Sequence, residues 1–227
     1  MEKLELTILM PCLNEEKTIG ECIKEAKMFI DESGINAEIL IADNGSTDNS
    51  VVIATENGAR VVNVEDKGYG NALIGGINQA KGKYIIIGDC DMSYDFYHLE
   101  SFVEKLREGY KLVMGNRFAG GIEKGAMPFS HRYIGVPFLS WLGRVKYKTD
   151  IVDFHCGLRG FDTEAALLLD LKCGGMEFAT ELIGSFARSG AKITQIPTVL
   201  RKDKRDCKPH LHTIRDGYRH LVYILKS

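Results

Sequence analysis

The chain lacks a strong net charge, paired cysteines and a long apolar run, and each absence narrows the class of protein. Its 227 residues include 29 basic and 31 acidic side chains, a formal net charge of −2, so the charge gives no reason to expect a nucleic-acid partner. The six cysteines form no CxxC pair and no zinc-finger spacing, which favours reduced thiols in the cytoplasm over a disulfide scaffold. The longest later apolar stretch, residues 134–142, is far shorter than the roughly 20 residues of a spanning helix.

Two common nucleotide-binding signatures are also missing. The segment "KGYGNAL" places Gly68 and Gly70 as a dinucleotide-binding loop would, but Leu73 stands where the third glycine is required. No GxxxxGK[ST] loop occurs anywhere in the chain. These absences argue against a dehydrogenase and against a P-loop ATPase.

Apolar runs of strand length alternate with helix-like segments through the first half of the chain. The unbroken run at residues 84–87 is typical of a strand that is covered on both faces. Strands that alternate with helices of this length predict βαβ units and a parallel sheet. The predicted strands span residues 6–11, 38–43, 60–64 and 83–89, and the predicted helices span residues 15–30, 45–59 and 68–82.

The pattern becomes less regular after about residue 115. A helix near residues 178–189 and a strand at residues 192–197 are the clearest later elements. We therefore predict an α/β protein with a mostly parallel, Rossmann-like central sheet flanked by helices. One domain is expected over residues 1–213, with its later half, residues 116–213, forming the acceptor side of a cleft.

Polar side chains follow each of the four early strands. Asn14, Asp43, Lys67 and Asp89 all fall at or just beyond predicted strand ends. The carboxyl ends of parallel strands meet at one edge of the sheet, which is where such sheets bind their ligands. The sequence therefore predicts a single site on this rim.

The segment "GDCDMSYD" places Asp89 and Asp91 together at the end of the fourth strand. Two neighbouring carboxylates repel unless a cation joins them. Mg²⁺ is commonly held by one or two carboxylates together with water and substrate phosphates, and Mn²⁺ suits the same oxygen ligands. The alternative is that the two aspartates cap the helix that follows the strand.

Two other rim segments also have alternative interpretations. "PCLNEE" is either a helix start with Asn14 as N-cap or a nucleotide contact in which Glu15 accepts from ribose or base. "ADNGSTDNS" is either a turn and cap sequence or a segment in which Asp43 accepts from a base N–H or a ribose hydroxyl.

Seven segments in this order resemble family 2 glycosyltransferases of the GT-A fold. The most similar branch is that of dolichyl-phosphate mannose synthase and the bacterial polyprenyl-phosphate glycosyltransferases. Asn44 departs from the family pattern, in which a second aspartate is frequent, and this leaves the choice of base open. The segments are "PCLNEEKTI", "ADNGSTDNS", "DKGYGNAL", "GDCDMSYD", "GNRF", "DFHCGLRGF" and "GMEFATELI".

The resemblance implies an inverting transfer of a sugar from a UDP- or GDP-linked donor to a polyprenyl phosphate, with Mg²⁺ or Mn²⁺ as cofactor. It implies a nucleotide-sugar half over about residues 1–115 and an acceptor half after it. The implied nucleotide contacts are Pro11, Leu13, Asn14, Glu15, Asp43, Asn44 and Lys67, and the implied metal ligands are Asp89 and Asp91.

The same resemblance implies roles for residues of the second half. A phosphate acceptor is already ionised at neutral pH, so forked positive charges matter more than a strong base. Acceptor-phosphate contacts are implied at Arg117, Arg201, Arg205 and Lys208, and catalytic roles at Asp89, Asp91, Glu181 and Arg117. Asp153, Arg159 and Glu177 are expected to touch the sugar or to lie behind it, and the alternative for Asp153 and Arg159 is a buried ion pair that braces the site.

The last 27 residues contain eight basic and three acidic side chains. Residues 214–227 are predicted to form an amphipathic helix, with an apolar stripe of Ile214, Tyr218, Leu221, Val222 and Leu225. We expect this helix to lie on the cytoplasmic face of a membrane, so that the protein is peripherally associated. The alternative is that the stripe packs on the domain.

Two rival functions differ from a polyprenyl-phosphate glycosyltransferase. A transferase with a hydroxyl acceptor, such as a diacylglycerol or a glycan, would need a true base, for which Glu177 and Glu181 are the candidates. An inactive sugar-nucleotide-binding regulatory module would have no need of both Asp89 and Asp91, and their presence counts against it.

Overall fold

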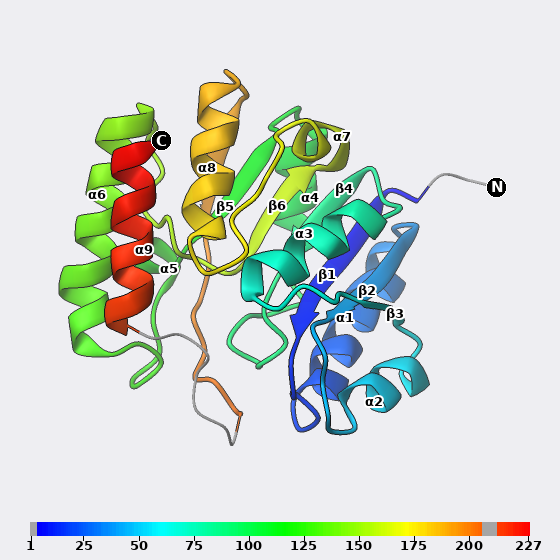
Figure 1. The fold of residues 1–227 in the computed structure, drawn as a ribbon. Helices are drawn as coiled ribbons and strands as arrows, with labels where there is room; N and C mark the ends of the chain where they lie inside the picture. Colours follow the sequence, from blue (N-terminus) through cyan, green and yellow to red (C-terminus); the bar gives the residue numbers. More distant parts are fainter. Residues whose placement is uncertain (1–3, 206–212) are drawn as a thin grey trace.

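The computed structural model describes residues 4–205 and 213–227, and its centre is one seven-stranded sheet (Figure 1). The strand order is β3-β2-β1-β4-β6-β5-β7, and β6 alone runs antiparallel to its neighbours β4 and β5. The strands are β1 (Leu6–Cys12), β2 (Ala37–Asp43), β3 (Arg60–Asn63), β4 (Tyr84–Ile87), β5 (Leu112–Asn116), β6 (Arg159–Asp162) and β7 (Ile193–Pro197). The predicted α/β fold with a mostly parallel sheet is confirmed.

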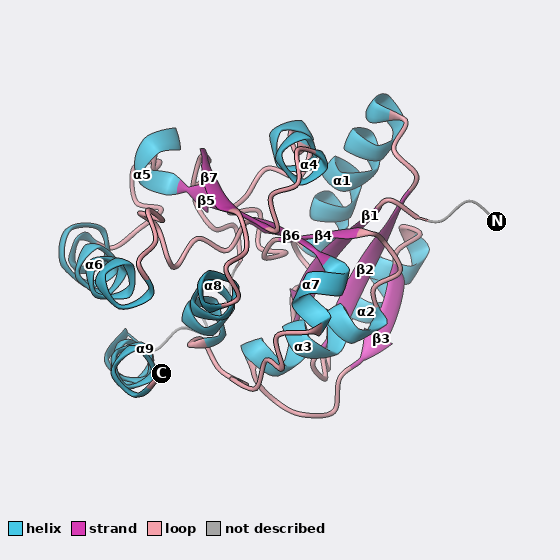
Figure 2. Cartoon of the chain, turned by 90° about the horizontal axis from the view of Figure 1, so that it is seen from above, coloured by secondary structure: helices cyan, strands magenta, loops and turns pink. Residues whose placement is uncertain are grey.

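Helices cover both faces of this sheet (Figure 2). Helices α1 and α4 lie on one face, and α3, α7 and α8 lie on the other. The helices are α1 (Ile19–Ser33), α2 (Ser50–Glu56), α3 (Tyr69–Gln79), α4 (Glu100–Arg107), α5 (Arg117–Gly120), α6 (Val136–Tyr147), α7 (Thr163–Leu167), α8 (Phe178–Arg188) and α9 (Thr213–Lys226), and a π-helical turn, η1 (His131–Gly135), precedes α6.

The central strands are apolar because both of their faces are covered. Ile85, Ile86 and Ile87 of β4 have no exposed surface, and neither do Leu9 and Met10 of β1. Parallel strands buried in this way lose the polar alternation of a half-exposed strand. The hydrophobic pattern of the first half was therefore sufficient to predict these strands.

The first helix begins later than predicted. It starts at Ile19 with Thr18 at the N-cap position, not at Glu15. Asn14 has a φ of 58° and its Oδ1 accepts a hydrogen bond from the Thr47 backbone N–H at 2.8 Å. The interpretation of Asn14 as the N-cap is therefore wrong, because its side chain joins β1 to the loop after β2.

Helix α9 packs beside α6 and α8 (Figure 1). Its buried residues are Asp216, His220 and Ile224. His220 Nδ1 lies 2.8 Å from Thr180 Oγ1 on α8, so polar contacts hold this face of the helix. Within the predicted stripe, Ile214, Tyr218 and Leu225 are exposed, whereas Leu221 and Val222 are half-buried. The alternative in which the stripe packs on the domain is therefore wrong for the three exposed residues.

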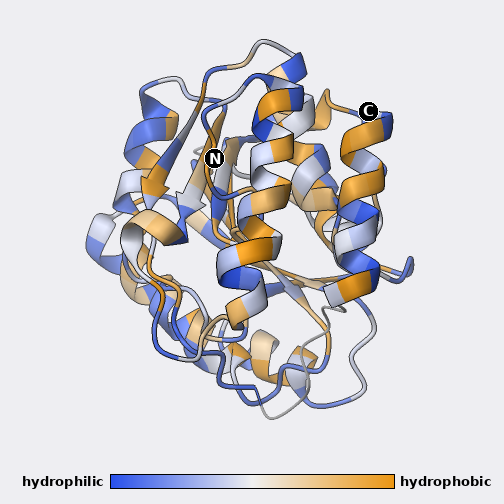
Figure 3. Ribbon diagram, turned by 90° about the vertical axis from the view of Figure 1, so that its left-hand side faces the viewer, coloured by the Kyte–Doolittle hydropathy of each residue, from blue (hydrophilic) through white to orange (hydrophobic). Residues whose placement is uncertain are grey.

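Helices α6 and α9 each contain hydrophobic residues, drawn in orange in Figure 3, and several of them are exposed. The exposed positions lie three, four or seven residues apart, which places each set on one side of its helix. We call these seven residues the apolar face: Ile134, Phe138, Trp141, Val145, Ile214, Tyr218 and Leu225. No helix within the described residues is long and apolar enough to cross a membrane.

The packing of α3 on the sheet predicts opposite effects for two Gly→Ala substitutions. A Cβ at Gly76 would lie 2.5 Å from Leu9 Cδ1, whereas a Cβ at Gly217 in α9 would meet nothing within 4 Å. We expect Gly76→Ala to lower the free energy of unfolding by about 1–3 kcal/mol through overpacking. Gly217→Ala should raise it by up to about 1 kcal/mol through helix propensity.

Urea unfolding of both variants, followed by circular dichroism, measures these changes. A Gly76→Ala protein as stable as the wild type would contradict the close packing of α3 on β1.

Candidate active site

The acidic tip of β4 lies at the carboxyl end of the sheet. Asp89 Oδ1 accepts a hydrogen bond from the Tyr69 hydroxyl at 3.0 Å. Its other oxygen faces Gly157, where a Cβ would lie only 2.4 Å from Asp89 Oδ2. Burial, together with the charge of Asp91, raises the pKa of Asp89 to about 6. The site therefore holds this carboxylate in an environment that favours an added positive charge.

Asp91 is buried and faces an arginine from far along the chain. Its Oδ1 accepts from the Ser93 backbone N–H at 2.9 Å, and its Oδ2 lies 3.0 Å from Arg205 Nη2. The next helix, α4, has Leu99 at its N-cap position. The alternative in which the two aspartates cap that helix is therefore wrong.

The Arg205 guanidinium joins three acidic side chains. Its Nη1 donates to Glu15 Oε1 at 3.0 Å, and its Nη2 lies 3.0 Å from Asp91 Oδ2 and 2.6 Å from Asp203 Oδ2. Burial raises the pKa of Glu15 to about 7, although the nearby guanidinium opposes the shift. The three carboxylates hold the pKa of Arg205 above its usual value despite its partial burial. Negative charge at this rim is thus balanced in part by a side chain of the protein itself.

Residues 201–205 form a strap along the acidic tip. The Arg201 backbone N–H donates to the Ser93 carbonyl at 2.9 Å, and that of Lys204 donates to the Asp91 carbonyl at 3.1 Å. The Arg201 side chain lies 2.8 Å from Glu25 Oε1 and 2.5 Å from Asp95 Oδ2. The strap therefore places Arg205 against the acidic tip and Arg201 against Glu25 and Asp95, whereas Lys208 lies outside the described residues.

The loop after β2 is organised around Asp43. This buried carboxylate accepts from the backbone N–H groups of Gly45 and Ser46 at 3.0 and 3.2 Å. Asp43 is the last residue of β2, and its register partner on β1 is Cys12. Pro11 belongs to β1, and Leu13 and Asn14 follow it. The structure therefore brings the predicted nucleotide residues Pro11, Leu13, Asn14, Glu15 and Asp43 to one end of the sheet.

Asn44 holds the loop that carries Lys67. Its Nδ2 donates to the carbonyls of Val64 and Asp66 at 3.0 and 2.8 Å, and its Oδ1 accepts from the Gly68 N–H at 2.8 Å. Lys67 Nζ in turn donates to the Asn44 carbonyl at 2.7 Å. An amide side chain fits this position because its nitrogen can donate to two carbonyl oxygens while its oxygen accepts from a backbone N–H.

Arg117 and Asp153 form a buried, two-pronged ion pair. Arg117 Nε and Nη2 donate to the two Asp153 carboxylate oxygens at 2.7 and 2.8 Å. Asp153 has no exposed surface. Asp153 therefore pairs with Arg117 and not with Arg159, so the predicted Asp153–Arg159 ion pair is wrong.

Several buried polar atoms near Arg159 have no hydrogen-bond partner among the described residues. They are Arg159 Nη1, both ring nitrogens of His155 and Glu177 Oε2. Glu177 Oε1 accepts from Arg219 Nη2 of α9. Buried polar groups without a partner are costly, so this region is suited to a polar ligand.

Glu181 is engaged with the protein backbone. Its two carboxylate oxygens accept from the N–H groups of Lys172 and Cys173 at 3.0 and 2.8 Å. The neighbouring Gly174 carbonyl accepts from the Gly70 N–H at the start of α3. Glu181 thus fixes a loop that packs against the helix carrying Tyr69.

Sequence reasoning missed three residues of this arrangement: Tyr69, Gly157 and Asp203. Tyr69 lies within the quoted "KGYGNAL" and Gly157 within "DFHCGLRGF", but nothing local indicates that either faces Asp89. Asp203 lies inside a basic segment, and the segment was interpreted only by its positive charge. Its role is seen only in the structure, where its carboxylate accepts hydrogen bonds from Arg205 beside the tip of β4.

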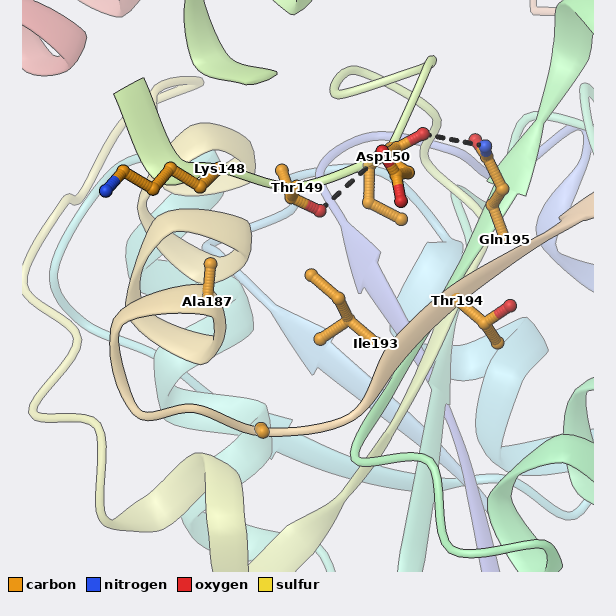
Figure 4. A pocket seen from close by; sticks show the side chains of 9 residues that line it. Lys148, Thr149, Asp150, Ala187, Ile193, Thr194 and Gln195 are labelled. Atoms are coloured by element: carbon orange, nitrogen blue, oxygen red, sulfur yellow. Dashed lines mark hydrogen bonds between the residues drawn. The ribbon is translucent and has the colours of Figure 1, made fainter. Parts of the chain in front are cut away.

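A cavity elsewhere does not contain the predicted residues (Figure 4). It has a volume of about 400 Å³ and lies between the end of α8, strand β7 and residues 148–151. Gln195 Nε2 closes one side by donating to the Asp150 carbonyl at 3.0 Å. The carboxylates of the β4 tip are not part of its lining, so we do not place the active site there.

Residues 7–167 match the family model described as glycosyl transferase family 2. The low-salt glycan biosynthesis hexosyltransferase Agl6 of Haloferax volcanii is 36% identical over 221 residues, which cover 97% of this chain and 53% of that protein. The dolichyl-phosphate hexose transferase of the same organism is 28% identical, over 90% of this chain and 86% of that protein. The chain spans about half the length of Agl6.

A solved structure has a similar fold. Glucosyl-3-phosphoglycerate synthase from Mycobacterium tuberculosis, in complex with Mn²⁺, UDP and phosphoglyceric acid, is 23% identical with a TM-score of 0.78. The match covers 98% of this chain and 79% of that one. The predicted GT-A type of α/β fold is thereby confirmed.

The contacts of Asn44 predict a large effect of a small substitution. Asn44→Asp replaces the donating amide by a carboxylate that faces two carbonyl oxygens. We expect the free energy of unfolding to fall by about 2–4 kcal/mol, because two hydrogen bonds are replaced by repulsion.

The matched control is Asn36→Asp, at an exposed position, which should change stability by less than about 0.5 kcal/mol. Thermal unfolding of both variants at neutral pH tests the prediction. Equal stability of the two would contradict the role of Asn44 in holding the Lys67 loop.

Proposed function

The chain belongs to glycosyl transferase family 2, and we propose that it transfers a sugar, with inversion, from a nucleotide-diphosphate sugar to a polyprenyl phosphate. The observation that carries this proposal is the strap, which sets two arginines beside the acidic tip of β4. One rim would thus hold both the binding site for the nucleotide sugar and the positive charge that an anionic acceptor needs. The printed name of the 28%-identical relative, a dolichyl-phosphate hexose transferase, supports the same acceptor class.

The donor set at the tip fits a hard divalent cation. Asp89 and Asp91 offer carboxylate oxygens, and burial, together with the neighbouring charge of Asp91, raises the pKa of Asp89. Within residues 4–205 and 213–227, no cluster of three or more His, Cys, Asp or Glu side chains could hold a metal alone. Mg²⁺ and Mn²⁺ are typically completed by substrate phosphates and water, so Asp91, with Asp89 beside it, would hold the ion.

Such an ion would neutralise charge on the departing nucleotide diphosphate. Tyr69 orients Asp89 through its hydroxyl, and the hydrogen bond favours the ionised carboxylate. Asp43 and Glu15 would accept from the nucleoside, while Lys67 would approach the diphosphate. Buried His155, Arg159 and Glu177 would meet the sugar hydroxyls with their unpaired atoms.

The acceptor would be bound through its phosphate. A phosphate monoester has a second pKa of about 6 and is largely dianionic at neutral pH, so it needs no strong base. Arg201 and Arg205 can each present a planar fork of N–H donors to phosphate oxygens. Arg117 remains a proposed contact, although it would first have to exchange Asp153 for the phosphate.

A second candidate is transfer to a hydroxyl acceptor. It is favoured by Glu177, whose buried Oε2 has no partner among the described residues and could accept a proton. Glu181 is less suited because both of its oxygens accept backbone N–H groups. A bell-shaped pH profile of kcat that flattens in Glu177→Gln would favour this candidate.

The proposed activity predicts a metal-dependent reaction that requires Asp91. We expect incubation with UDP- or GDP-sugars, Mn²⁺ and a short polyprenyl phosphate to yield a glycosylated lipid, detected by mass spectrometry. Asp91→Asn should reduce turnover at least about a hundredfold, because stabilisation of the leaving group is lost. Asp170→Asn, at an exposed position, is the control and should keep full turnover.

Turnover by chelator-treated protein, or by Asp91→Asn at the wild-type rate, would refute the metal assignment. Exclusive transfer to a hydroxyl acceptor would refute the phosphate assignment alone.

We also propose that the apolar face lies on a membrane surface. Its residues belong to two neighbouring helices, and Trp141, Ile214 and Tyr218 are 51%, 88% and 67% exposed. Exposed apolar groups of this extent on a soluble domain commonly mark an interaction site. A lipid acceptor would reach a site on such a protein directly from the bilayer, and basic residues beside the face would be attracted to anionic headgroups.

This proposal predicts that vesicle binding depends on the apolar face. We expect the wild type to co-sediment with vesicles that contain phosphatidylglycerol, and Trp141→Ser/Tyr218→Ser to lose most of that binding. The control, Val52→Ser/Leu168→Ser, also removes two exposed apolar side chains but lies outside the apolar face. Equal sedimentation of both variants would contradict the proposed membrane surface.

A further inference from the structure

Arg205 occupies the position at which the acidic tip needs a cation. Its guanidinium lies between Glu15 and Asp91, at 3.0 Å from an oxygen of each. Asp203 Oδ2 accepts from Arg205 Nε and Nη2 at 2.9 and 2.6 Å, which fixes the plane of the guanidinium. The same Asp91 oxygen that would face a metal ion is thus already in contact with positive charge.

A metal ion and this guanidinium cannot share Asp91 in the present arrangement. Two cations at contact distance from one carboxylate oxygen would repel each other strongly in a partly buried site. Conversely, Asp91 and Glu15 are both less than a tenth exposed, and buried charges are unfavourable without a partner. One cation must therefore leave as the other arrives.

The strap allows the guanidinium to leave while the backbone stays attached. Arg201 is anchored independently of Asp91 and Glu15, through Glu25, Asp95 and the Ser93 carbonyl. Within the described residues, Arg205 contacts Glu15 and Asp91 through its long side chain, so rotation about side-chain bonds can carry the guanidinium away from Asp91. It would remain on the same rim, with its N–H donors available to a new anion.

We infer that Arg205 is a resident counter-ion of the metal-binding carboxylates, and that loading of a divalent cation releases it to bind the acceptor phosphate. The site would then be filled in a fixed order, with the metal and donor first and the acceptor second. By linkage, metal binding and phosphate binding each strengthen the other by the same factor. The second step rests on the proposed function, whereas the exchange of cations at Asp91 does not.

The exchange is tested by Mn²⁺ binding without any substrate. Titration of the full chain with Mn²⁺, followed by the electron paramagnetic resonance of the free ion, gives the affinity. Arg205→Gln removes the competing cation, and we expect it to bind Mn²⁺ roughly tenfold to a hundredfold more tightly than the wild type, as for loss of a charged hydrogen bond.

Lys204→Gln is the matched control, because it removes the same charge from the adjacent position. The Lys204 side chain is exposed, and its backbone N–H makes the contact with Asp91. We expect its Mn²⁺ affinity to change by less than about threefold, since an exposed charge is screened by salt. Equal affinities of Arg205→Gln and Lys204→Gln would overturn the exchange.

Thermal unfolding provides a second measurement. Without metal, Arg205→Gln should unfold at a lower temperature than Lys204→Gln, because Asp91 and Glu15 lose a partner, and saturating Mn²⁺ should remove the difference. If Arg205→Gln does not fold without metal, Arg205→Lys replaces it and should bind Mn²⁺ more tightly than Lys204→Gln, whereas equal affinities would overturn the exchange. A deficit of Arg205→Gln that Mn²⁺ leaves unchanged would overturn the exchange.

The release step is tested with phenyl phosphate as a simple monoester. We expect Mn²⁺ together with UDP or GDP to increase its affinity for the wild type, and to have no such effect on Arg205→Gln. An unchanged affinity in the wild type would overturn the transfer of Arg205 to the acceptor. Tighter Mn²⁺ binding by Arg205→Gln in a protein that does not glycosylate polyprenyl phosphate would instead uphold the exchange and refute the proposed acceptor.

Discussion

Three carboxylates, those of Glu15, Asp91 and Asp203, converge on the single guanidinium of Arg205 at the end of the central strand β4. Their mutual repulsion makes the rim unstable without positive charge. The strap, residues 201–205, supplies this positive charge, because Arg205 contacts Glu15 and Asp91 of the first half of the fold. It also explains why one edge of the sheet can hold a cation and an anion-binding arginine side by side.

The rest of the rim is organised so that this charge cluster stays in place. Asn44 fixes the loop of Lys67 from one side. On the other side, Glu181 fixes the loop that packs on the start of α3, and Tyr69 at that start holds Asp89. The side chains of the second half thus act on the first through backbone hydrogen bonds. Loops held in this way suit a site in which only the Arg205 side chain has to move.

Much of the fold could be predicted from the sequence because its strands are short, apolar and regularly spaced. The positions of Asp43 and Asp89 at the rim followed from the parallel topology, since strand ends share an edge. The partners of charged residues could not be predicted. Nothing in the local sequence indicates that Arg117 pairs with Asp153 or that Arg205 lies between Glu15 and Asp91, because these contacts join distant segments. The inward face of α9 could not be predicted either, since its buried residues include the polar side chains of Asp216 and His220 as well as Ile224.

The central claim is that the acidic tip binds a divalent cation in exchange for Arg205. The most direct measurement is the crystal structure of the chain soaked with Mn²⁺ and a nucleotide diphosphate, with the ion located by its anomalous scattering. The account predicts an anomalous peak at coordination distance from Asp91 Oδ2, with the Arg205 guanidinium turned away from that oxygen. A nucleotide bound at the rim with no peak at Asp91, and with Arg205 still in contact with it, would contradict the account.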